Sequence, residues 1–175
     1  MTSKLKVNLI NDSGDNNIIT SDGSGNVTLG TAFPSVGKIG QVSHVTTNTQ
    51  LTLTTSGFVD IGLQRVITPS STSSNILIFV NLHSKFNDTG QNAAYTIKML
   101  RDSTQIYTGG QTYEIVSETI NGSGQHKDSW TFLDSPSSTS ALTYKVQVST
   151  YNNSDVIFQR NGYFQSELLV MEVLA

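Results

Sequence analysis

The C-terminal segment 168–175 carries the clearest pattern of hydrophobic positions in the chain. Successive side chains of a strand point to opposite faces of the sheet. One face here is formed by Leu169, Met171 and Val173, and the other by Leu168, Val170, Glu172 and Leu174. A surface strand of a monomer normally has one polar face, so we predict that both faces meet protein, one the chain's own core and the other a sister subunit. A central strand covered on both faces within one domain explains the pattern equally well.

Apolar runs separated by turn residues recur from Ile39 to the end of the chain. They predict strands near 41–53, 58–67, 75–84, 94–100, 105–107, 113–119, 129–133, 142–150, 156–159 and 165–174. The run at 76–82 is apolar at successive positions and predicts a central strand covered on both faces. The run at 142–148 alternates, with Lys145 and Gln147 facing water. Because no segment of helical length shows a 3.6-residue period, we predict an all-β sandwich or barrel.

Residues 1–37 differ from the rest of the chain. A short alternating strand at 6–10 precedes a turn rich in Asn and Asp, and the runs 18–20 and 26–29 predict a β-hairpin. This segment has too few large apolar residues for a core, so it must lie on the main domain, on copies of itself or on a larger assembly. A linker at 30–37 completes the predicted division into domains 1–37 and 38–175.

Composition favours strands and excludes several classes of function. Charged residues make up 13% of the chain, against a typical ~25%. The net charge of −3 and scattered lysines argue against nucleic-acid binding, and the absence of cysteine excludes disulfides and thiolate metal sites. Oligomerisation is the usual substitute for disulfides in an exposed protein. No apolar run has the length of a signal peptide or membrane span, so we expect synthesis in a cytoplasm without membrane insertion.

No group of residues forms a recognisable catalytic motif, and the sequence predicts binding rather than catalysis. His44, His83 and His126 share no metal-ligand spacing and are expected to be solvated or cross-strand residues. The carboxylates considered as an acid–base pair are Glu114, Glu118, Glu167 and Glu172. Nothing in the sequence brings two of them together. Asp12 and Asp15 fit an Asn- and Asp-rich turn better than a calcium loop, so we expect no metal and no cofactor.

The aromatic residues suggest two roles. Trp130 and Phe132 share one strand face and are predicted to point into the core. Tyr151, Tyr163 and Phe164 lie in or beside loops rich in Asn and Gly. These three either cap an edge of the core or stack on a carbohydrate, and they are the candidates for recognition.

Several segments together resemble a module of virion proteins from marine tailed bacteriophages. The run Ser3–Ile10, followed by Asn17–Val27, resembles the start of short phage fibre and structural proteins. The segments that resemble landmarks of their distal domain are Thr68–Val80, Met99–Ser103, Phe132–Pro136, Leu142–Gln147 and Leu168–Val173. The resemblance therefore spans nearly the whole chain.

This resemblance implies a homotrimeric jelly roll similar to the heads of tumour-necrosis-factor and complement-type proteins, whose first and last strands lie together in the inner sheet near the threefold axis. It implies a structural protein of the virion, held by other virion proteins, and does not distinguish tail from capsid. We predict a tail fibre or spike that adheres to a host glycan or protein, with Tyr151, Tyr163 and Phe164 as the candidates for host-surface contact. The alternative is a capsid fibre or decoration protein that stabilises the head shell. The trimer interface is predicted at Leu168, Val170, Met171, Val173 and Leu174. Virion attachment is predicted at Leu5, Val7, Leu9, Ile10, Ile18 and Val27.

Overall fold

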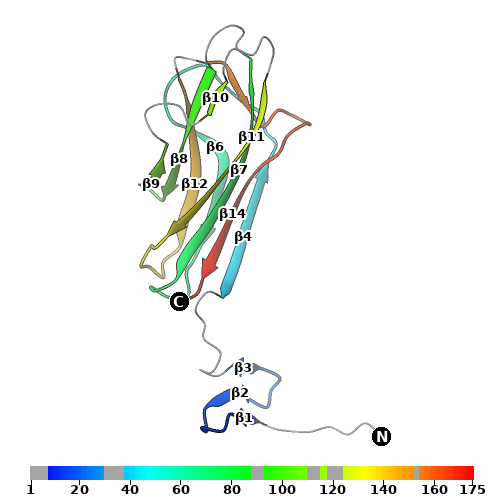
Figure 1. Cartoon of the computed structure of the whole chain (residues 1–175), viewed down its shortest axis with the longest axis vertical. Helices are drawn as coiled ribbons and strands as arrows, with labels where there is room; N and C mark the ends of the chain where they lie inside the picture. Colours follow the sequence, from blue (N-terminus) through cyan, green and yellow to red (C-terminus); the bar gives the residue numbers. More distant parts are fainter. Residues whose placement is uncertain (1–7, 30–37, 88–92, 110–114, 118–123, 152–153) are drawn as a thin grey trace, which may run out of the picture. The chain divides into compact units, whose positions relative to one another are not determined.

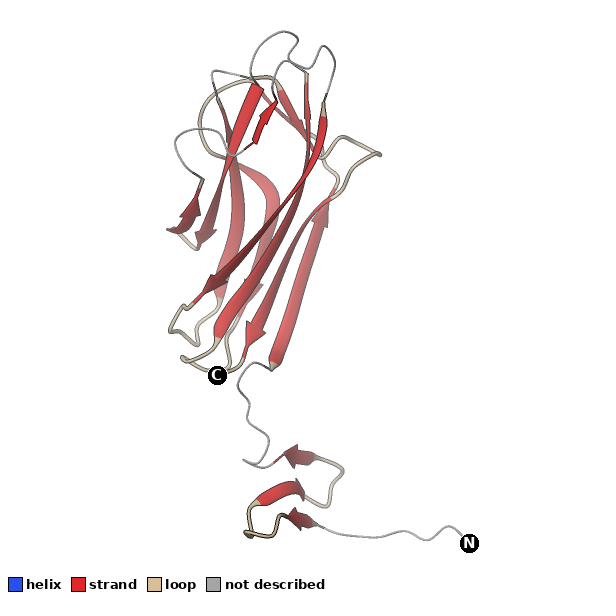
Figure 2. Ribbon diagram, viewed as in Figure 1, coloured by secondary structure: helices blue, strands red, loops and turns tan. Residues whose placement is uncertain are grey.

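The computed structural model describes residues 8–29, 38–87, 93–109, 115–117, 124–151 and 154–175. These residues form strands and loops, and no helix is found among them (Figure 2). The chain divides into two compact units, Met1–Val36 and Gly37–Ala175. The prediction of an all-β protein is confirmed.

The smaller unit is a three-stranded antiparallel sheet. Its strands are β1 (Leu9–Asn11), β2 (Asn17–Ser21) and β3 (Val27–Leu29), in the order β1-β2-β3. The predicted hairpin is confirmed, because β2 pairs with β3 with Ser21 opposite Val27. Where a burial class is given, each side chain of this sheet is exposed or half-buried, so the unit has no enclosed core among its described residues.

An aspartate closes each turn of this small sheet. Asp12 Oδ1 accepts hydrogen bonds from the backbone N–H groups of Gly14 and Asn16, at 2.8 and 3.0 Å. Asp22 Oδ1 accepts the equivalent bonds from Ser24 and Asn26, at 2.7 and 3.1 Å. These are Asx turns, in which the side chain replaces a backbone acceptor. They explain the repeated spacing of an aspartate and an asparagine four residues later.

The larger unit contains the remaining strands (Figure 1). They are β4 (Ile39–Thr47), β5 (Leu51–Leu53), β6 (Val59–Ile67), β7 (Asn75–Phe86), β8 (Ala93–Arg101), β9 (Thr104–Thr108), β10 (Ile115–Ser117), β11 (Gln125–Asp134), β12 (Leu142–Thr150), β13 (Val156–Phe158) and β14 (Ser166–Val173). Alternation explains most of them. In β12, for example, the side chains alternate between buried and half-buried, with Lys145 and Gln147 on the outer side as predicted.

The strands form two antiparallel sheets with the topology of a jelly roll. In the first sheet β6, β12 and β8 are neighbours in that order, and β9 and β10 pair with the far edge of β8. In the second sheet β4, β14, β7 and β11 are neighbours, and β5 and β13 extend the positions of β4 and β14. The chain alternates between the sheets as in a double Greek key. The first and last strands of the unit, β4 and β14, lie side by side, as the resemblance implies.

The core lies between the two sheets. Its fully buried members include Ile76, Ile78, Val80 and Leu82 of β7 and Leu168 and Val170 of β14. Trp130 and Phe132 of β11 pack against this cluster, so the prediction that they point inward is confirmed.

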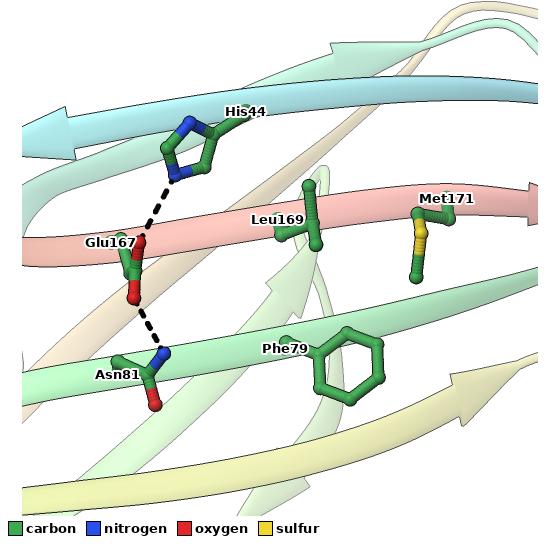
Figure 3. A pocket seen from close by; sticks show the side chains of 6 residues that line it. All are labelled: His44, Phe79, Asn81, Glu167, Leu169 and Met171. Atoms are coloured by element: carbon green, nitrogen blue, oxygen red, sulfur yellow. Dashed lines mark hydrogen bonds and ion pairs between the residues drawn. The ribbon is translucent and has the colours of Figure 1, made fainter.

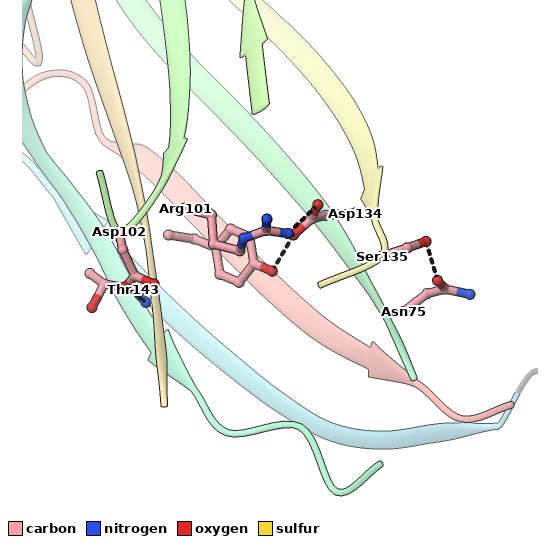
Figure 4. Close-up of polar contacts among 7 residues, drawn as sticks. Asn75, Arg101, Asp102, Asp134, Ser135 and Thr143 are labelled. Carbon is pink, nitrogen blue, oxygen red and sulfur yellow. Dashed lines mark hydrogen bonds and ion pairs between the residues drawn. The ribbon is translucent and has the colours of Figure 1, made fainter. Parts of the chain in front are cut away.

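A partly buried polar cluster also joins the sheets (Figure 4). Arg101 Nη1 of β8 donates to both carboxylate oxygens of Asp134 in β11, each at 2.8 Å. The hydroxyl of Tyr144 in β12 donates to the same carboxylate at 2.6 Å. Burial, followed by the neighbouring Asp134, raises the pKa of Tyr144 far above its ordinary value. Tyr144 therefore stays protonated and remains a hydrogen-bond donor.

Glu172, near the end of β14, is 1% exposed despite its charge. Its carboxylate accepts hydrogen bonds from Gln41 Nε2 at 2.8 Å and from the backbone N–H and hydroxyl of Ser70 at 2.6 and 2.7 Å. Burial alone would raise the pKa of Glu172, but these hydrogen bonds outweigh burial and lower it to about 2. The side chain therefore joins the last strand to β4 and to the loop that precedes β7.

Two strand predictions need correction. The predicted strand 41–53 is two strands, because the Gln50 N–H bonds to the side chain of Asn161 at 3.0 Å instead of to a neighbouring strand. The run 76–82 is central, but only one of its faces is covered within the chain, since Leu77, Phe79 and Asn81 are half-buried on the outer side. Parts of the predicted strand 113–119 lie outside the described residues.

Candidate interaction face

The outer face of the sheet β4-β14-β7-β11 carries an apolar block near the C-terminus. Residues directly opposite one another in antiparallel strands share a face. The strand registers therefore define one row across the sheet as Val42, Met171, Leu77 and Leu133. The neighbouring row is His44, Leu169, Phe79 and Thr131. Most of the large apolar groups on this face are gathered in these two rows.

Two members of the first row are strongly exposed. Val42 is 58% exposed and Leu133 is 64% exposed, while Met171, Leu77, Leu169 and Phe79 are half-buried. Contiguous apolar surface that a single copy of a protein leaves exposed marks a binding surface more often than a neutral patch. We call Val42, Leu77, Phe79, Leu133, Leu169 and Met171 the apolar block.

A polar belt crosses all four strands beside the apolar block. Glu167 Oε2 lies 3.3 Å from His44 Nε2, and Asn81 Nδ2 donates to Glu167 Oε1 at 2.6 Å. The hydroxyl of Ser129 donates to Asn81 Oδ1. The hydrogen bond from Asn81 is the main cause that lowers the pKa of Glu167. At neutral pH the belt therefore contains a carboxylate whose oxygens are both engaged within the chain.

Block and belt together line a hollow of about 620 Å³ (Figure 3). Its walls are His44, Phe79, Asn81, Glu167, Leu169 and Met171. Figure 3 shows Phe79, Leu169 and Met171 side by side, with the His44–Glu167–Asn81 hydrogen bonds along one edge. The hollow is an open depression on a sheet face, with an apolar floor and one polar margin.

The chemistry of this face suits binding. Glu167 and His44 form a cross-strand pair, which confirms the cross-strand prediction for this histidine. The hydroxyl of Ser129 donates to Asn81 rather than to His44. Ser129, His44 and Glu167 therefore do not have the geometry of a nucleophile activated by a base. In the described part of the chain no three His, Cys, Asp or Glu side chains lie close enough to hold a metal ion. That same part contains no helix able to cross a membrane.

The structure separates the residues that the sequence assigns to a trimer interface. Leu168 and Val170 are fully enclosed in the chain's own core, so their assignment to an interface is wrong. Met171 and Val173 lie on the opposite, outer side of β14 and are half-buried. Leu174 is also half-buried, and its N–H donates to the carbonyl of Lys38 at 2.8 Å. One face of β14 is thus core and the other is open.

The residues assigned to virion attachment lie in or before the small sheet. Leu9, Ile10 and Val27 are exposed and Ile18 is half-buried. Leu5 and Val7 lie outside the described residues, as do Glu114 and Glu118. The two remaining candidates for an acid–base pair, Glu167 and Glu172, are on opposite faces of β14.

The loop aromatics are divided between two places. Tyr163 and Phe164 share the loop that joins β13 to β14, and the Phe164 ring stacks on His83 with centroids 5.1 Å apart. Tyr151 follows β12, and its N–H donates to the carbonyl of Ala94 at 3.0 Å. Burial, together with the charge of Lys127, lowers the pKa of His83 below its ordinary value.

Sequence reasoning missed Val42, Leu77, Phe79 and Leu133 as members of an exposed face. For Leu77 and Phe79 the signal is the continuous apolar run of β7, which a strand covered on both faces inside one domain explains equally well. Val42 and Leu133 lie on β4 and β11, and the sequence did not single them out. The pairing of β7 with β11 and β14 shows which residues share this face, and their burial shows that the chain leaves it open.

Comparisons with known proteins identify no family for this chain. No protein-family model and no curated protein matches the sequence. The chain is similar to a structure of infectious bursal disease virus, Gx strain, with 10% identity and a TM-score of 0.41, covering 86% of this chain and 43% of that one. It is also similar to the VP2 subviral particle of infectious bursal disease virus, with 13% identity and a TM-score of 0.41, covering 93% of this chain and 43% of that one. The chain thus spans less than half the length of either, and a similarity this weak carries no conclusion about function.

Proposed function

We propose that this chain is a phage virion structural protein that acts by binding, as a homotrimeric tail fibre or spike that adheres to the host surface. The resemblance to phage fibre proteins supports the virion role, and the jelly-roll topology agrees with that resemblance. The single observation on which self-association rests is the uncovered apolar block on the outer face of β4-β14-β7-β11. In this proposal copies of the chain cover that face.

The number of copies comes from the resemblance, which implies a closed trimer. In a three-membered ring each copy contributes two different patches to its two interfaces, so no patch is left free. Burying the apolar block removes exposed Val42 and Leu133 from water, and each fully buried side chain of this size contributes ~1.5–3 kcal/mol. The polar belt contributes specificity more than affinity, because its hydrogen bonds are already satisfied within the chain.

The small sheet is proposed to hold the chain on the virion. Its described side chains enclose no core, and Leu9, Ile10 and Val27 are exposed. A sheet of three short strands needs a partner to bury one face. The attachment residues are then those assigned from the sequence, and the larger unit, which has its own core, points away from the particle.

The experiment compares the incorporation of the full chain and of the fragment 38–175 into virions made in infected cells. The fragment has a complete core, so we expect it to fold and associate but to be absent from purified virions. Residues 1–37 fused to an unrelated carrier should be recruited to the particles. Imaging of virions labelled on the full chain then shows whether the protein is on the tail.

The capsid alternative makes the opposite prediction for the fragment. If fragment 38–175 still binds to virions and the label is on the head shell, the jelly roll itself contacts the particle. The protein is then a capsid fibre or decoration protein, and the adhesin proposal is wrong. If neither the full chain nor the fragment is found in virions, the virion proposal fails altogether.

A further inference from the structure

Two loops at one end of the sheet β4-β14-β7-β11 border a second, smaller hollow. They are residues 48–50, between β4 and β5, and residues 159–165, between β13 and β14 (Figure 1). The hollow has a volume of about 200 Å³ and is lined by Asn48, Gly162, Tyr163, Phe164 and Gln165. It shares no lining residue with the larger hollow.

Hydrogen bonds hold the two loops in place. The backbone N–H of Gln50 donates to Asn161 Oδ1 at 3.0 Å, and the N–H of Asn161 donates to Gln50 Oε1 at 3.4 Å. The N–H groups of Tyr163 and Phe164 both donate to the carbonyl of Arg160, at 3.1 and 3.2 Å. A site built on such reciprocal contacts exists before a ligand arrives, which lowers the entropic cost of binding.

The groups in this hollow suit a sugar ring. Tyr163 is 72% exposed and presents an aromatic face with a hydroxyl, while the amides of Asn48 and Gln165 supply donors and acceptors. The volume is below the ~300 Å³ at which pockets for drug-sized ligands begin. One ring of a glycan fits this size better than an extended chain.

Arg160 adds a positive charge beside the ring. Its guanidinium carbon lies 4.7 Å from the centroid of Tyr163. No carboxylate of the described residues lies within ion-pair distance of it. A guanidinium held in this way favours a planar carboxylate, with which it forms paired charge-assisted hydrogen bonds.

The geometry points to a binding site for a carboxylated sugar residue, such as a uronic acid of a host-surface glycan. The sugar ring stacks on the face of Tyr163 that Arg160 leaves open, and Arg160 reaches its carboxylate past the edge of the tyrosine ring. Asn48 and Gln165 bond its hydroxyl groups. This inference rests on the proposed adhesive function and specifies the ligand of that function. It also explains why the candidates for host-surface contact divide, since Tyr163 and Phe164 line the hollow and Tyr151 does not.

The test uses the purified full chain and saturation-transfer NMR with two matched probes, methyl glucuronide and methyl glucoside. We expect the glucuronide to bind about tenfold more tightly, as one charge-assisted contact implies. Tyr163→Ala should abolish binding of both probes. Arg160→Gln should bring the two affinities within about twofold of each other, and Tyr151→Ala, an exposed loop aromatic outside the hollow, should change neither.

Three results would overturn the inference. They are no transfer to either probe, equal binding of the two probes by the unaltered chain, and unchanged binding after Tyr163→Ala. The Trp130 fluorescence of each variant reports whether it is folded. Because these measurements need no virion, they separate the two proposals: absence from particles refutes the proposed function, while absence of sugar binding by a chain that is on the tail refutes only this site.

Discussion

Replacing Glu172 with glutamine tests whether the buried carboxylate stabilises the end of β14. The substitution keeps the size of the side chain but removes its charge. It also places an amide NH2 among groups that donate hydrogen bonds, namely Gln41 Nε2 and the N–H and hydroxyl of Ser70. A donor facing donors leaves buried polar groups unsatisfied, which costs ~1–3 kcal/mol for neutral groups and more for charged ones.

The magnitude follows from the pKa of Glu172, which is about 2 in the folded protein instead of 4.5. Each pKa unit corresponds to about 1.4 kcal/mol, so the ionised carboxylate contributes about 3 kcal/mol to the free energy of unfolding at neutral pH. Glu172→Gln should remove about this amount. The matched control is Glu167→Gln on the outer side of the same strand, where an exposed ion pair contributes only ~0–1 kcal/mol.

The pH dependence gives a second, independent expectation. A carboxyl whose pKa is lowered by folding stabilises the protein fully above its unfolded pKa of 4.5. This stabilisation is lost as the pH falls from about 4.5 toward 2, because in this range the unfolded state takes up a proton that the folded state does not bind. The difference between the unaltered chain and Glu172→Gln should therefore be constant from pH 7 to about 5 and shrink below pH 4.5.

Urea unfolding, followed by the fluorescence of Trp130 at several pH values, measures both effects. Trp130 is the chain's single tryptophan and packs against the core. Protein concentration must be held fixed, since self-association adds stability by mass action. A loss below about 0.5 kcal/mol at pH 7, or a difference that persists unchanged at pH 3, would show that the carboxylate does not have the proposed role.

Three further predictions concern the face, the core and metal binding. Val42→Lys should weaken self-association at least ~100-fold in sedimentation or light scattering, because a charge is buried without a partner. Val66→Lys is the matched control, since Val66 is on the other sheet and is 55% exposed. Equal self-association of the two variants would exclude this face as the interface. Asp134→Asn should lower the free energy of unfolding in urea by ~2–3 kcal/mol, because it removes a charged acceptor that two donors share. Tyr144→Phe should lower it by ~1 kcal/mol, because only one hydroxyl is lost. Equal losses of stability in the two variants would contradict the network in Figure 4. A chelator should leave the melting temperature unchanged, and a fall of several degrees would reveal a structural ion.

The sequence predicts the strands well because alternation is a local property. Strand β12 begins and ends where the pattern places it, and β14 differs from its prediction by a single residue at each end. The break after β4 was not predictable, since it depends on Asn161, a residue 111 positions away from Gln50 in the chain. Long-range hydrogen bonds of this kind leave no periodic signal.

The candidate site shows the same limit more sharply. The sequence indicates that β14 is apolar on both faces, but it cannot say which face the chain covers by itself. Leu168 and Val170 were assigned to the interface together with Met171 and Val173, although neighbouring side chains of a strand point in opposite directions. Deciding between the faces requires the position of the second sheet, which depends on pairings spread over the whole larger unit.

In the proposed trimer, stability and self-association are coupled at the end of β14. Gly40 lies so close to this strand that a Cβ atom there would come within 2.9 Å of Leu174 Cδ2 and 3.0 Å of Glu172 Oε2. Glu172 thus fixes β14 against β4 next to Met171 and Val42, which belong to the apolar block. Loosening this contact should distort the face as well as lower the stability. A weaker trimer in Glu172→Gln would therefore not by itself identify the interface, whereas Val42→Lys changes the outer face at an exposed position and leaves the Glu172 contacts intact.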